Sequence, residues 1–409
     1  MKKSTVLKIL SAALASALAL SLAGCTGGVS GETKNYNVNM ALAQSEEQYS
    51  STVEMLASIR PTVVDVTSYN DVSSSAGSGV VISKAESGNQ YFIITNHHVI
   101  DGGKSFTVDV LSIADDGTES TQTYEARLVG SSLKRDIAVL TVTPPEDVSF
   151  SLATFISDSD SVKVGTEVYA IGNPLGILGG TVTHGIVSAT RRAVNISEIG
   201  SMTLMQTDAL TNGGNSGGGL FDSDGKLVGI INSGYETYND RQVEGLNFAI
   251  PANDARFAAK ELIDTHVEEG DEVVSYGYVE GDARMDLTFS YSTLYSDSSL
   301  LARGNYLIAQ AAESSPIYAS WTNTLKAVQS ITVNGEKTDL SASGSGSYSL
   351  TTLANEVIGG VKAGDKVTIE YKDILTRTTS AFFGTSYYYL GGETKSVTVT
   401  AQQYIYQPE

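Results

Sequence analysis

The sequence predicts a mainly β protein with more than one domain. Its 409 residues exceed the usual size of a single domain, which is about 100–200 residues. Forty glycines, only seven prolines and abundant Ser, Thr, Tyr and Val suit strands and tight turns better than helices or disordered chain. Short apolar or alternating segments, separated by Gly, Asn, Asp and Ser, also recur along the chain.

The N-terminus predicts export. Three lysines in the first eight residues precede an apolar stretch over 9–22, which is too short to span a membrane and reads as a signal segment over residues 1–24. The following Leu22-Ala23-Gly24-Cys25 resembles the lipobox of bacterial lipoproteins, which implies cleavage before Cys25 and lipid attachment to its sulfur. We therefore expect a protein anchored to the membrane and facing away from the cytoplasm. A plain secretory signal with an incidental cysteine is the alternative.

Three further properties limit the chemistry. Cys25 is the single cysteine, so no internal disulfide is possible. The formal net charge of -20 repels phosphate backbones, and we expect no nucleic-acid partner. The four histidines show no zinc-ligand spacing accompanied by carboxylates, so we expect no metal and no cofactor.

The first folded domain is expected over residues 51–252. Residues 25–50 are polar and predict a flexible tether, and a short helix is expected over 51–59, before Pro61. Apolar or alternating segments then predict a series of short strands, as in a sandwich or barrel. These segments are 63–67, 79–82, 91–95, 106–111, 137–142, 167–171, 181–190, 227–231 and 246–250.

A linker helix and a second β domain complete the chain. Helical periodicity follows Asn253, a residue type that often caps helices, and Gly270 is expected to end this helix, so 253–270 is assigned to the linker. Residues 271–409 are again rich in strand formers, and Asn334-Gly335 predicts a tight turn. A further short helix is expected over 353–361.

One glycine-dense segment has the composition of a nucleophile loop. Residues 212–219 read Asn-Gly-Gly-Asn-Ser-Gly-Gly-Gly, with Ser216 at the centre. A serine that attacks an amide needs a base, an orienting acid and backbone N–H groups directed at the developing oxyanion. Glycines allow the N–H groups of Gly214 and Ser216 to converge on one point, although an ordinary Gly-Ser surface loop has the same composition.

Two distant segments supply the base and the acid. His98 follows an apolar strand segment, and Asp136 opens another. Alone, each also fits a packed histidine or a turn-capping aspartate. The order His, Asp, Ser, with separations of 38 (136 minus 98) and 80 (216 minus 136), favours a catalytic triad over these simpler interpretations.

The sequence around all three residues resembles the HtrA (DegP-type) family of trypsin-like serine proteases. Seven motifs carry the resemblance, which extends over about residues 51–257. They are Thr95-Asn96-x-His98-Val99, Asp136-Ile137-Ala138-Val139-Leu140, Gly214-Asn215-Ser216-Gly217-Gly218, Gly77-Ser78-Gly79-Val80-Val81-Ile82, Ala170-Ile171-Gly172-Asn173-Pro174-Leu175-Gly176, Thr207-Asp208-Ala209 and Asn247-Phe248-Ala249-Ile250-Pro251. The resemblance implies a double β-barrel, a serine endopeptidase acting through an acyl-enzyme, and His98 rather than His97 as the base.

The resemblance also implies where substrate binds. The segment from Ile231 through Asn232 and Ser233 to Gly234 is expected to pair with the substrate backbone as an added strand. Leu210, Thr211, Asn247 and Phe248 are expected to wall the specificity pocket. Because no acid occupies the position that the resemblance assigns to the pocket floor, near Leu210, small or medium aliphatic residues before the cut are expected rather than Lys or Arg.

A divergent PDZ-like domain is expected after the protease, because the family has one there. The glycine-bearing loop for a peptide carboxylate is not obvious, and residues 276–279 are a candidate. The aromatic-rich insertion 373–395 fits either a self-packed hairpin or a grip on unfolded chains.

The expected substrates are misfolded or regulatory exported proteins. A narrow-specificity signalling protease and a catalytically idle peptide-binding holdase are the alternatives. Family members commonly form trimers through N-terminal segments, to which Tyr36 and Tyr49 are candidate contributors.

Overall fold

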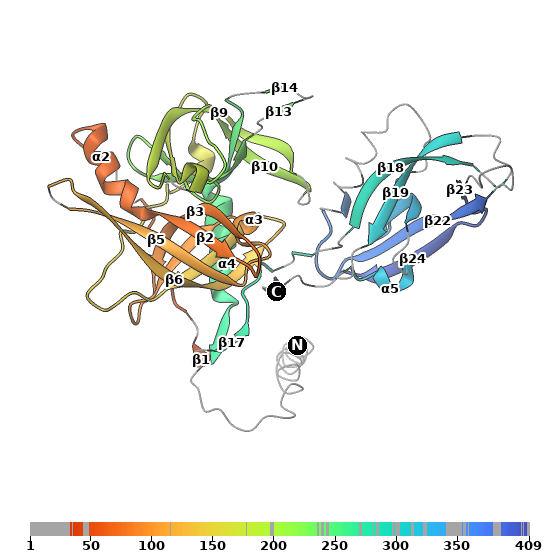
Figure 1. Ribbon diagram of the computed structural model, residues 1–409, viewed down its shortest axis with the longest axis horizontal. Helices are drawn as coiled ribbons and strands as arrows, with labels where there is room; N and C mark the ends of the chain where they lie inside the picture. The colour runs from red at the N-terminus through yellow and green to blue at the C-terminus, as the bar shows by residue number, and fades with distance from the viewer. Residues whose placement is uncertain are drawn as a thin grey trace, which may run out of the picture.

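The computed structural model describes most of residues 33–406, with longer gaps at 44–48, 341–353 and 379–385. The residues of the predicted signal segment and Cys25 lie outside the described part. Figure 1 shows two bodies, the first containing α2 to α4 and the second containing β18 to β24. No described helix is both long enough and apolar enough to span a bilayer.

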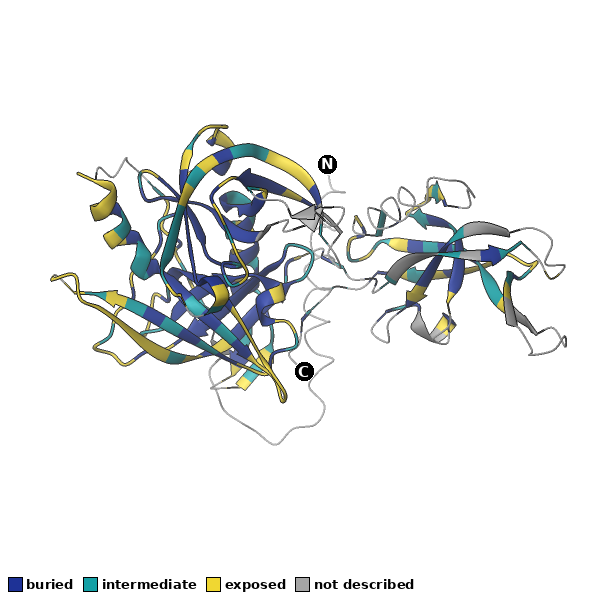
Figure 2. Ribbon diagram, turned by 45° about the horizontal axis from the view of Figure 1, so that its top comes forward, coloured by how far each residue is buried: buried dark blue, intermediate teal, exposed yellow. Residues whose placement is uncertain are grey.

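The first body is built on two closed six-stranded barrels. The first barrel has the strand order β2-β3-β4-β7-β6-β5 and the second has the order β10-β15-β12-β11-β8-β9. Both interiors are buried (Figure 2). Their strands are β2 Val63–Tyr69, β3 Ser74–Lys84, β4 Tyr91–Thr95, β5 Ser105–Ile113, β6 Glu119–Ser132, β7 Ile137–Val142, β8 Glu167–Gly172, β9 Thr181–Ile196, β10 Gly200–Thr207, β11 Gly219–Asp222, β12 Leu227–Gly234 and β15 Asn247–Pro251.

Helices and short strands frame these barrels. Helix α2 Thr52–Ile59 begins at Ser51, whose hydroxyl accepts from the N–H of Glu54, as expected of an N-cap. Helix α3 His97–Ile100 follows β4 directly, and α4 Ala252–Asp264 packs against β6, β7 and β12. The remaining elements of this body are β1 Thr33–Lys34, β13 Thr237–Tyr238, β14 Arg241–Gln242, β16 Val267–Glu269 and β17 Glu272–Ser275.

Helix α4 differs in detail from the predicted linker. It begins at Ala252 and ends at Thr265. The Asn253 side chain does not cap it, since it accepts from the N–H of Ser159 and donates to Asp158. The helix buries its alanines and leucine in the first body, so it is part of that body rather than a spacer.

The segment predicted to be a flexible tether is docked where it is described. Strand β1 pairs with β16, and single bridges join Val38 to Ala85 and Leu42 to Phe155. The side chain of Met40 is buried in the core of the first body. The prediction of flexibility is wrong here, because it was based on the overall polarity of the segment, whereas a few of its side chains make these contacts.

Tyr36 fixes the same segment through a buried carboxylate. Its hydroxyl donates to Glu268 at 2.5 Å, and Arg127 and His266 contact the other carboxylate oxygen at 3.2 and 3.1 Å. Burial would raise the pKa of Glu268, but the bonds from His266 and Tyr36 and the charge of Arg127 outweigh it and lower the pKa to about 2. Tyr36, a candidate for contacts between protomers, therefore makes its described polar contact within the chain.

The second body is a seven-stranded sheet in the order β21-β20-β19-β18-β23-β22-β24, with an additional pairing of β20 with β22. Asn334 and Gly335 both have positive φ, which confirms the predicted tight turn between β20 and β21. Of the helix expected over 353–361, Ala354, Val357 and Ile358 are helical, while residues 353, 355, 356 and 359 lie outside the described part. The elements are β18 Leu287–Tyr295, β19 Arg303–Ala311, α5 Tyr318–Trp321, β20 Lys326–Val333, β21 Glu336–Asp339, β22 Lys366–Thr378, β23 Ser386–Leu390 and β24 Lys395–Thr400.

Candidate active site

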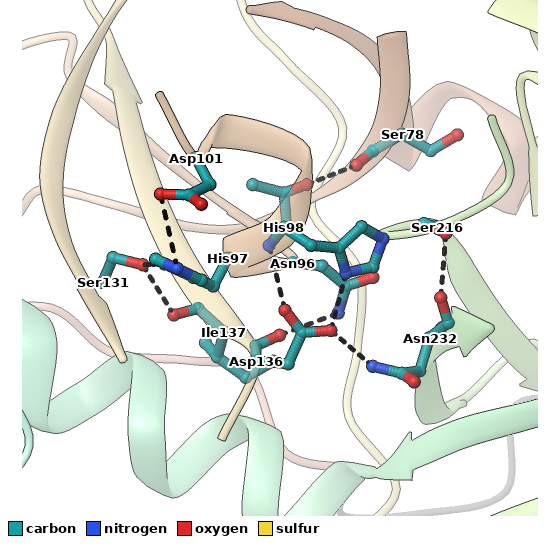
Figure 3. Close-up of polar contacts among 11 residues, drawn as sticks. Ser78, Asn96, His97, His98, Asp101, Ser131, Asp136, Ile137, Ser216 and Asn232 are labelled. Carbon is teal, nitrogen blue, oxygen red and sulfur yellow. Dashed lines mark hydrogen bonds and ion pairs between the residues drawn. The ribbon is translucent and has the colours of Figure 1, made fainter. Parts of the chain in front are cut away.

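His98 and Asp136 meet at the side of the first barrel, on the ends of paired strands. His98 lies on α3, just after β4, and Asp136 lies just before β7, which pairs with β4. The Nδ1 atom of His98 is 2.7 Å from Oδ2 of Asp136, and the backbone N–H of His98 donates to Oδ1 at 3.0 Å. Figure 3 shows this double contact, with the opposite edge of the imidazole turned toward Ser216 in this view.

The backbone at Asp136 is in an uncommon conformation. Its φ is 48°, in the left-handed region that Asp and Asn tolerate better than most side chains. The turn is held by its N–H, which donates to the carbonyl of Leu133, and by its carbonyl, which accepts from the side chain of Asn96 at 2.8 Å. The carboxylate is thereby buried and fixed against His98.

The surroundings of His98 favour its charged form. Burial by itself would lower the pKa of His98, but the hydrogen bond and the negative charge of Asp136 outweigh that effect and raise it above the usual value. The side chain of His98 is 44 % exposed, whereas that of Asp136 is 1 % exposed. The imidazole is thus reachable from solvent while its partner is not.

The loop around Ser216 has the backbone that its glycines predict. Gly214 and Gly217 have φ of 100° and 85°, and a Cβ at Gly214 would lie 2.2 Å from the carbonyl oxygen of Asn173. Within the described part of the chain, the N–H groups of Gly214 and Ser216 donate to no acceptor. Both are therefore available to an incoming oxygen.

Asn232 connects the serine to the aspartate. The Ser216 hydroxyl donates to the carbonyl of Asn232 at 2.8 Å, and the Asn232 side-chain amide donates to Oδ2 of Asp136 at 2.6 Å (Figure 3). The sequence placed Asn232 only among substrate-binding residues. Its contact with Asp136, over 96 positions, was not predicted, because nothing in the local sequence indicates that these loops meet.

Ser78 on β3 holds the serine loop through hydrogen bonds. Its hydroxyl donates to the carbonyl of Gly214 and accepts from the N–H of Asn173, each at 2.8 Å. Its own N–H donates to the carbonyl of Ser216 at 2.8 Å. Ser78 lies in one of the recognised motifs, but no role was predicted for it. The glycines on either side of it were the signal in the sequence that another backbone approaches closely.

Four of the expected pocket residues gather beside this loop. Leu210 is 55 % exposed, whereas Asn247 and Phe248 are buried. The hydroxyl of Thr211 donates to the side chain of Asn247 at 2.7 Å, and the Asn247 amide donates to the carbonyl of Ala209 at 3.0 Å. The accessible member of this set is an apolar side chain.

Ile231, the first residue of the expected substrate-pairing segment, already has backbone partners within the chain. Ile231 is buried, its N–H donates to Gly218 and its carbonyl accepts from Gly217. The pairing of β12 with β11 ends at Ile230, while β15 pairs with β12 as far as Gly234. Beyond Ile231, the described part of β12 pairs with β15 and not with β11.

Comparison with known proteins agrees with this arrangement. Residues 77–230 match the family described as trypsin-like peptidase domain. Over 242 residues the chain is 39 % identical to the "Serine protease Do-like HtrA" of Bacillus subtilis, an alignment that covers 54 % of this chain and 50 % of that protein. This chain contains a trypsin-like peptidase domain of the HtrA type. It is also 39 % identical over 188 residues to the "Periplasmic pH-dependent serine endoprotease DegQ" of Escherichia coli and 40 % identical over 194 residues to a "Probable periplasmic serine endoprotease DegP-like" of Brucella suis.

These alignments cover 46 % and 47 % of this chain and 37 % and 33 % of the two relatives, so the chain spans half or less of the length of the relatives it matches. His98, Asp136 and Ser216 all lie within residues 77–230, which match the trypsin-like peptidase family, whereas Asn247 and Phe248 lie beyond this range.

Two residues of the candidate carboxylate loop, Gly277 and Tyr278, make hydrogen bonds within the first body. The N–H of Gly277 donates to Val129 and that of Tyr278 donates to the hydroxyl of Thr265. A Cβ at Gly277 would lie 1.8 Å from the carbonyl oxygen of Leu262. These N–H groups are therefore not available to a peptide carboxylate, and that prediction is wrong.

The remaining histidines do not approach Ser216. His97 is buried and lies 2.7 Å from the hydroxyl of Ser131, which fits its expected packing role. The ring of His184 packs against Tyr169, and His266 contacts the buried Glu268.

Proposed function

We propose that this chain is a serine endopeptidase that hydrolyses peptide bonds of exported proteins, with His98, Asp136 and Ser216 as its triad. The observation that carries the proposal is the double contact of His98 with the buried Asp136, beside the glycine loop of Ser216. The printed names of the relatives, serine proteases and periplasmic endoproteases, support the same reaction class.

The proposed reaction begins with a rotation of the Ser216 hydroxyl. It donates to the carbonyl of Asn232 in the resting arrangement and must turn toward Nε2 of His98 to be activated. Because Nδ1 faces the carboxylate of Asp136, the neutral imidazole carries its proton there and leaves Nε2 as the acceptor. His98 then takes the serine proton as the oxygen attacks the peptide carbonyl.

The N–H groups of Gly214 and Ser216 would hold the oxyanion that forms in this step. The imidazolium next gives its proton to the leaving amine, which departs and leaves an acyl-enzyme. Water, deprotonated by His98, then attacks the ester and releases the acid product. Asp136 stays ionised throughout and stabilises the imidazolium.

Substrate binding is proposed along β12 beyond the end of its pairing with β11. The backbone from Asn232 to Gly234 would pair with the substrate strand, and Leu210, Thr211, Asn247 and Phe248 would receive the side chain before the cut. The exposed apolar surface of Leu210 supports a preference for Val or Ala over Arg. A peptide series cleaved faster after Arg than after Val or Ala would contradict this preference.

A fluorophosphonate probe tests the reaction directly. We expect labelling of Ser216 and cleavage of unfolded casein by the chain, and neither by a Ser216→Ala variant. A Ser112→Ala variant is the matched control, since it removes an exposed hydroxyl on β5, outside the proposed site. Equal cleavage by the chain and the Ser216→Ala variant, or no labelling of the chain, would remove the proposal.

The cellular setting is proposed from the N-terminal sequence and the relatives' names. Cys25 would carry the lipid, the second body would be a PDZ-like domain, and misfolded or regulatory exported proteins would be the substrates. A Cys25→Ser variant should lose incorporation of labelled fatty acid and leave the membrane fraction. Unchanged lipid labelling would contradict the assignment.

A further inference from the structure

The segment after β24 returns to the first barrel. Gln403 bridges to Ala283, and its side chain donates to the carbonyl of Val279 at 2.9 Å. Tyr406 then enters the hydrophobic core that the first barrel shares with Val99 and Ile100 of α3, and only 6 % of Tyr406 is exposed. A residue from the C-terminal part of the sequence thus packs against the short helix that carries His98.

Tyr406 contacts both ends of α3. Its hydroxyl accepts from the N–H of Gly102, just after the helix, at 3.1 Å. Its ring meets that of His97, the first residue of the helix, edge to face, with centroids 5.0 Å apart. Because α3 has only four residues and no side-chain cap at Asn96, it has little stability of its own and depends on such outside contacts.

His97 connects Tyr406 to the turn at Asp136 through Ser131. Its Nδ1 lies 2.7 Å from the hydroxyl of Ser131, which is also 3.3 Å from the carbonyl of Ile137, the residue after Asp136. A continuous set of contacts therefore runs from Tyr406 through His97 and Ser131 to the turn that holds Asp136 (Figure 3 shows all of it except Tyr406).

The same turn is held by a second residue from beyond α4. Asp282, which bridges to Lys362, accepts from the hydroxyl of Ser132 at 2.5 Å and lies 3.6 Å from Nε of Arg135. Both chain segments that form the His98–Asp136 contact are thus supported by residues outside the range that matches the trypsin-like peptidase family.

We propose that Tyr406 is a positioning residue for the active site, holding α3 so that His98 stays in register with Asp136. The inference rests on the proposed function for its effect on activity, although the effect on geometry does not require it. Loss of the ring should let α3 shift, and displacements of about 1 Å at such a contact can cost about 100-fold in rate.

Two readouts test the proposal in the full chain. The first is the titration midpoint of His98, followed by NMR of ring-labelled protein and assigned by its loss in a His98→Gln variant. The second is the rate of Ser216 labelling by the fluorophosphonate. The variants are Tyr406→Ala, Tyr406→Phe, which keeps the ring, and Tyr388→Ala, which removes an exposed tyrosine of the second body.

We expect Tyr406→Ala to lower the His98 midpoint toward its ordinary value and to slow labelling about 10- to 100-fold. Tyr406→Phe should shift both readouts in the same direction by less, and Tyr388→Ala should match the parent chain. If Tyr406→Ala unfolds, Tyr406→Phe decides.

Unchanged His98 midpoints in the folded variants would overturn the positioning role, as would an equal shift in Tyr388→Ala. The titration does not need activity. If the parent chain does not label, the proposed function fails, while the midpoints still decide the role of Tyr406.

Discussion

Ser78 offers a sharp test of how the serine loop is held. It is fully buried on β3, and its hydroxyl joins two loops, donating to Gly214 and accepting from Asn173. Changing Ser78 to alanine removes both bonds without changing the backbone. The carbonyl of Gly214 and the N–H of Asn173 then lose a partner in a place that water does not readily reach.

The expected cost follows from those two groups. A buried donor or acceptor left without a partner costs about 1–3 kcal/mol. We expect the free energy of unfolding to fall by about 2–4 kcal/mol in Ser78→Ala, allowing for partial relaxation of the loops. Without this hydrogen bond, the position of the Gly214 N–H should be less well fixed, so labelling of Ser216 should slow by about tenfold or more.

Ser83 provides the matched control on the same strand. It is as buried as Ser78, but its hydroxyl has no hydrogen-bond partner among the described residues. Ser83→Ala removes an unsatisfied polar group, so the free energy of unfolding should stay the same or rise. Urea unfolding of both variants and fluorophosphonate kinetics measure these effects. Equal losses of stability in the two variants, or full-rate labelling of Ser78→Ala, would refute the reasoning.

Three further predictions concern the triad and its loop. Asp136→Asn should lower kcat/KM by about 10⁴-fold, since an amide has a single acceptor oxygen and cannot accept from the backbone N–H of His98 as well as from Nδ1 of His98 and from Asn232; activity within about tenfold of the parent would contradict this. Because Asp136 raises the pKa of His98, the imidazole stays protonated to higher pH. The labelling rate should therefore rise with pH to a plateau, with a midpoint above the ordinary pKa of histidine. A midpoint at or below that ordinary value would contradict this prediction. Gly214→Ala, whose Cβ would lie 2.2 Å from the carbonyl oxygen of Asn173, should reduce labelling by about 100-fold, and an unaffected rate would show that the oxyanion donors lie elsewhere.

Most strands were predictable because alternation and β-branched runs mark a strand with one buried face. β4 and β7 match their predicted bounds residue for residue, and both are buried throughout. β6 was missed because its first half is a polar, exposed part of a hairpin with β5, where no core imposes a pattern. β11 was missed because it has only four residues directly after the glycine loop.

The site was predictable to the extent that its residues lie in recognisable motifs. His98 and Asp136 do meet, as their motifs predict. The contacts from Asn232, Ser78 and Tyr406 were not predictable, since each depends on which distant loops the barrels bring together. The positive φ of Asp136 likewise results from the turn and its partners, not from the residue type alone.

The docking of the N-terminal segment at Thr33 limits how far the proposed lipid is from the enzyme. From Cys25 to Thr33 there are eight residues (33 minus 25). At full extension of about 3.3–3.6 Å per residue, they reach about 26–29 Å. With its lipid inserted, the catalytic body would remain within about one protein diameter of the bilayer surface. Such an enzyme would act on chains emerging from the membrane or lying beside it, and would have little access to the distant extracellular space.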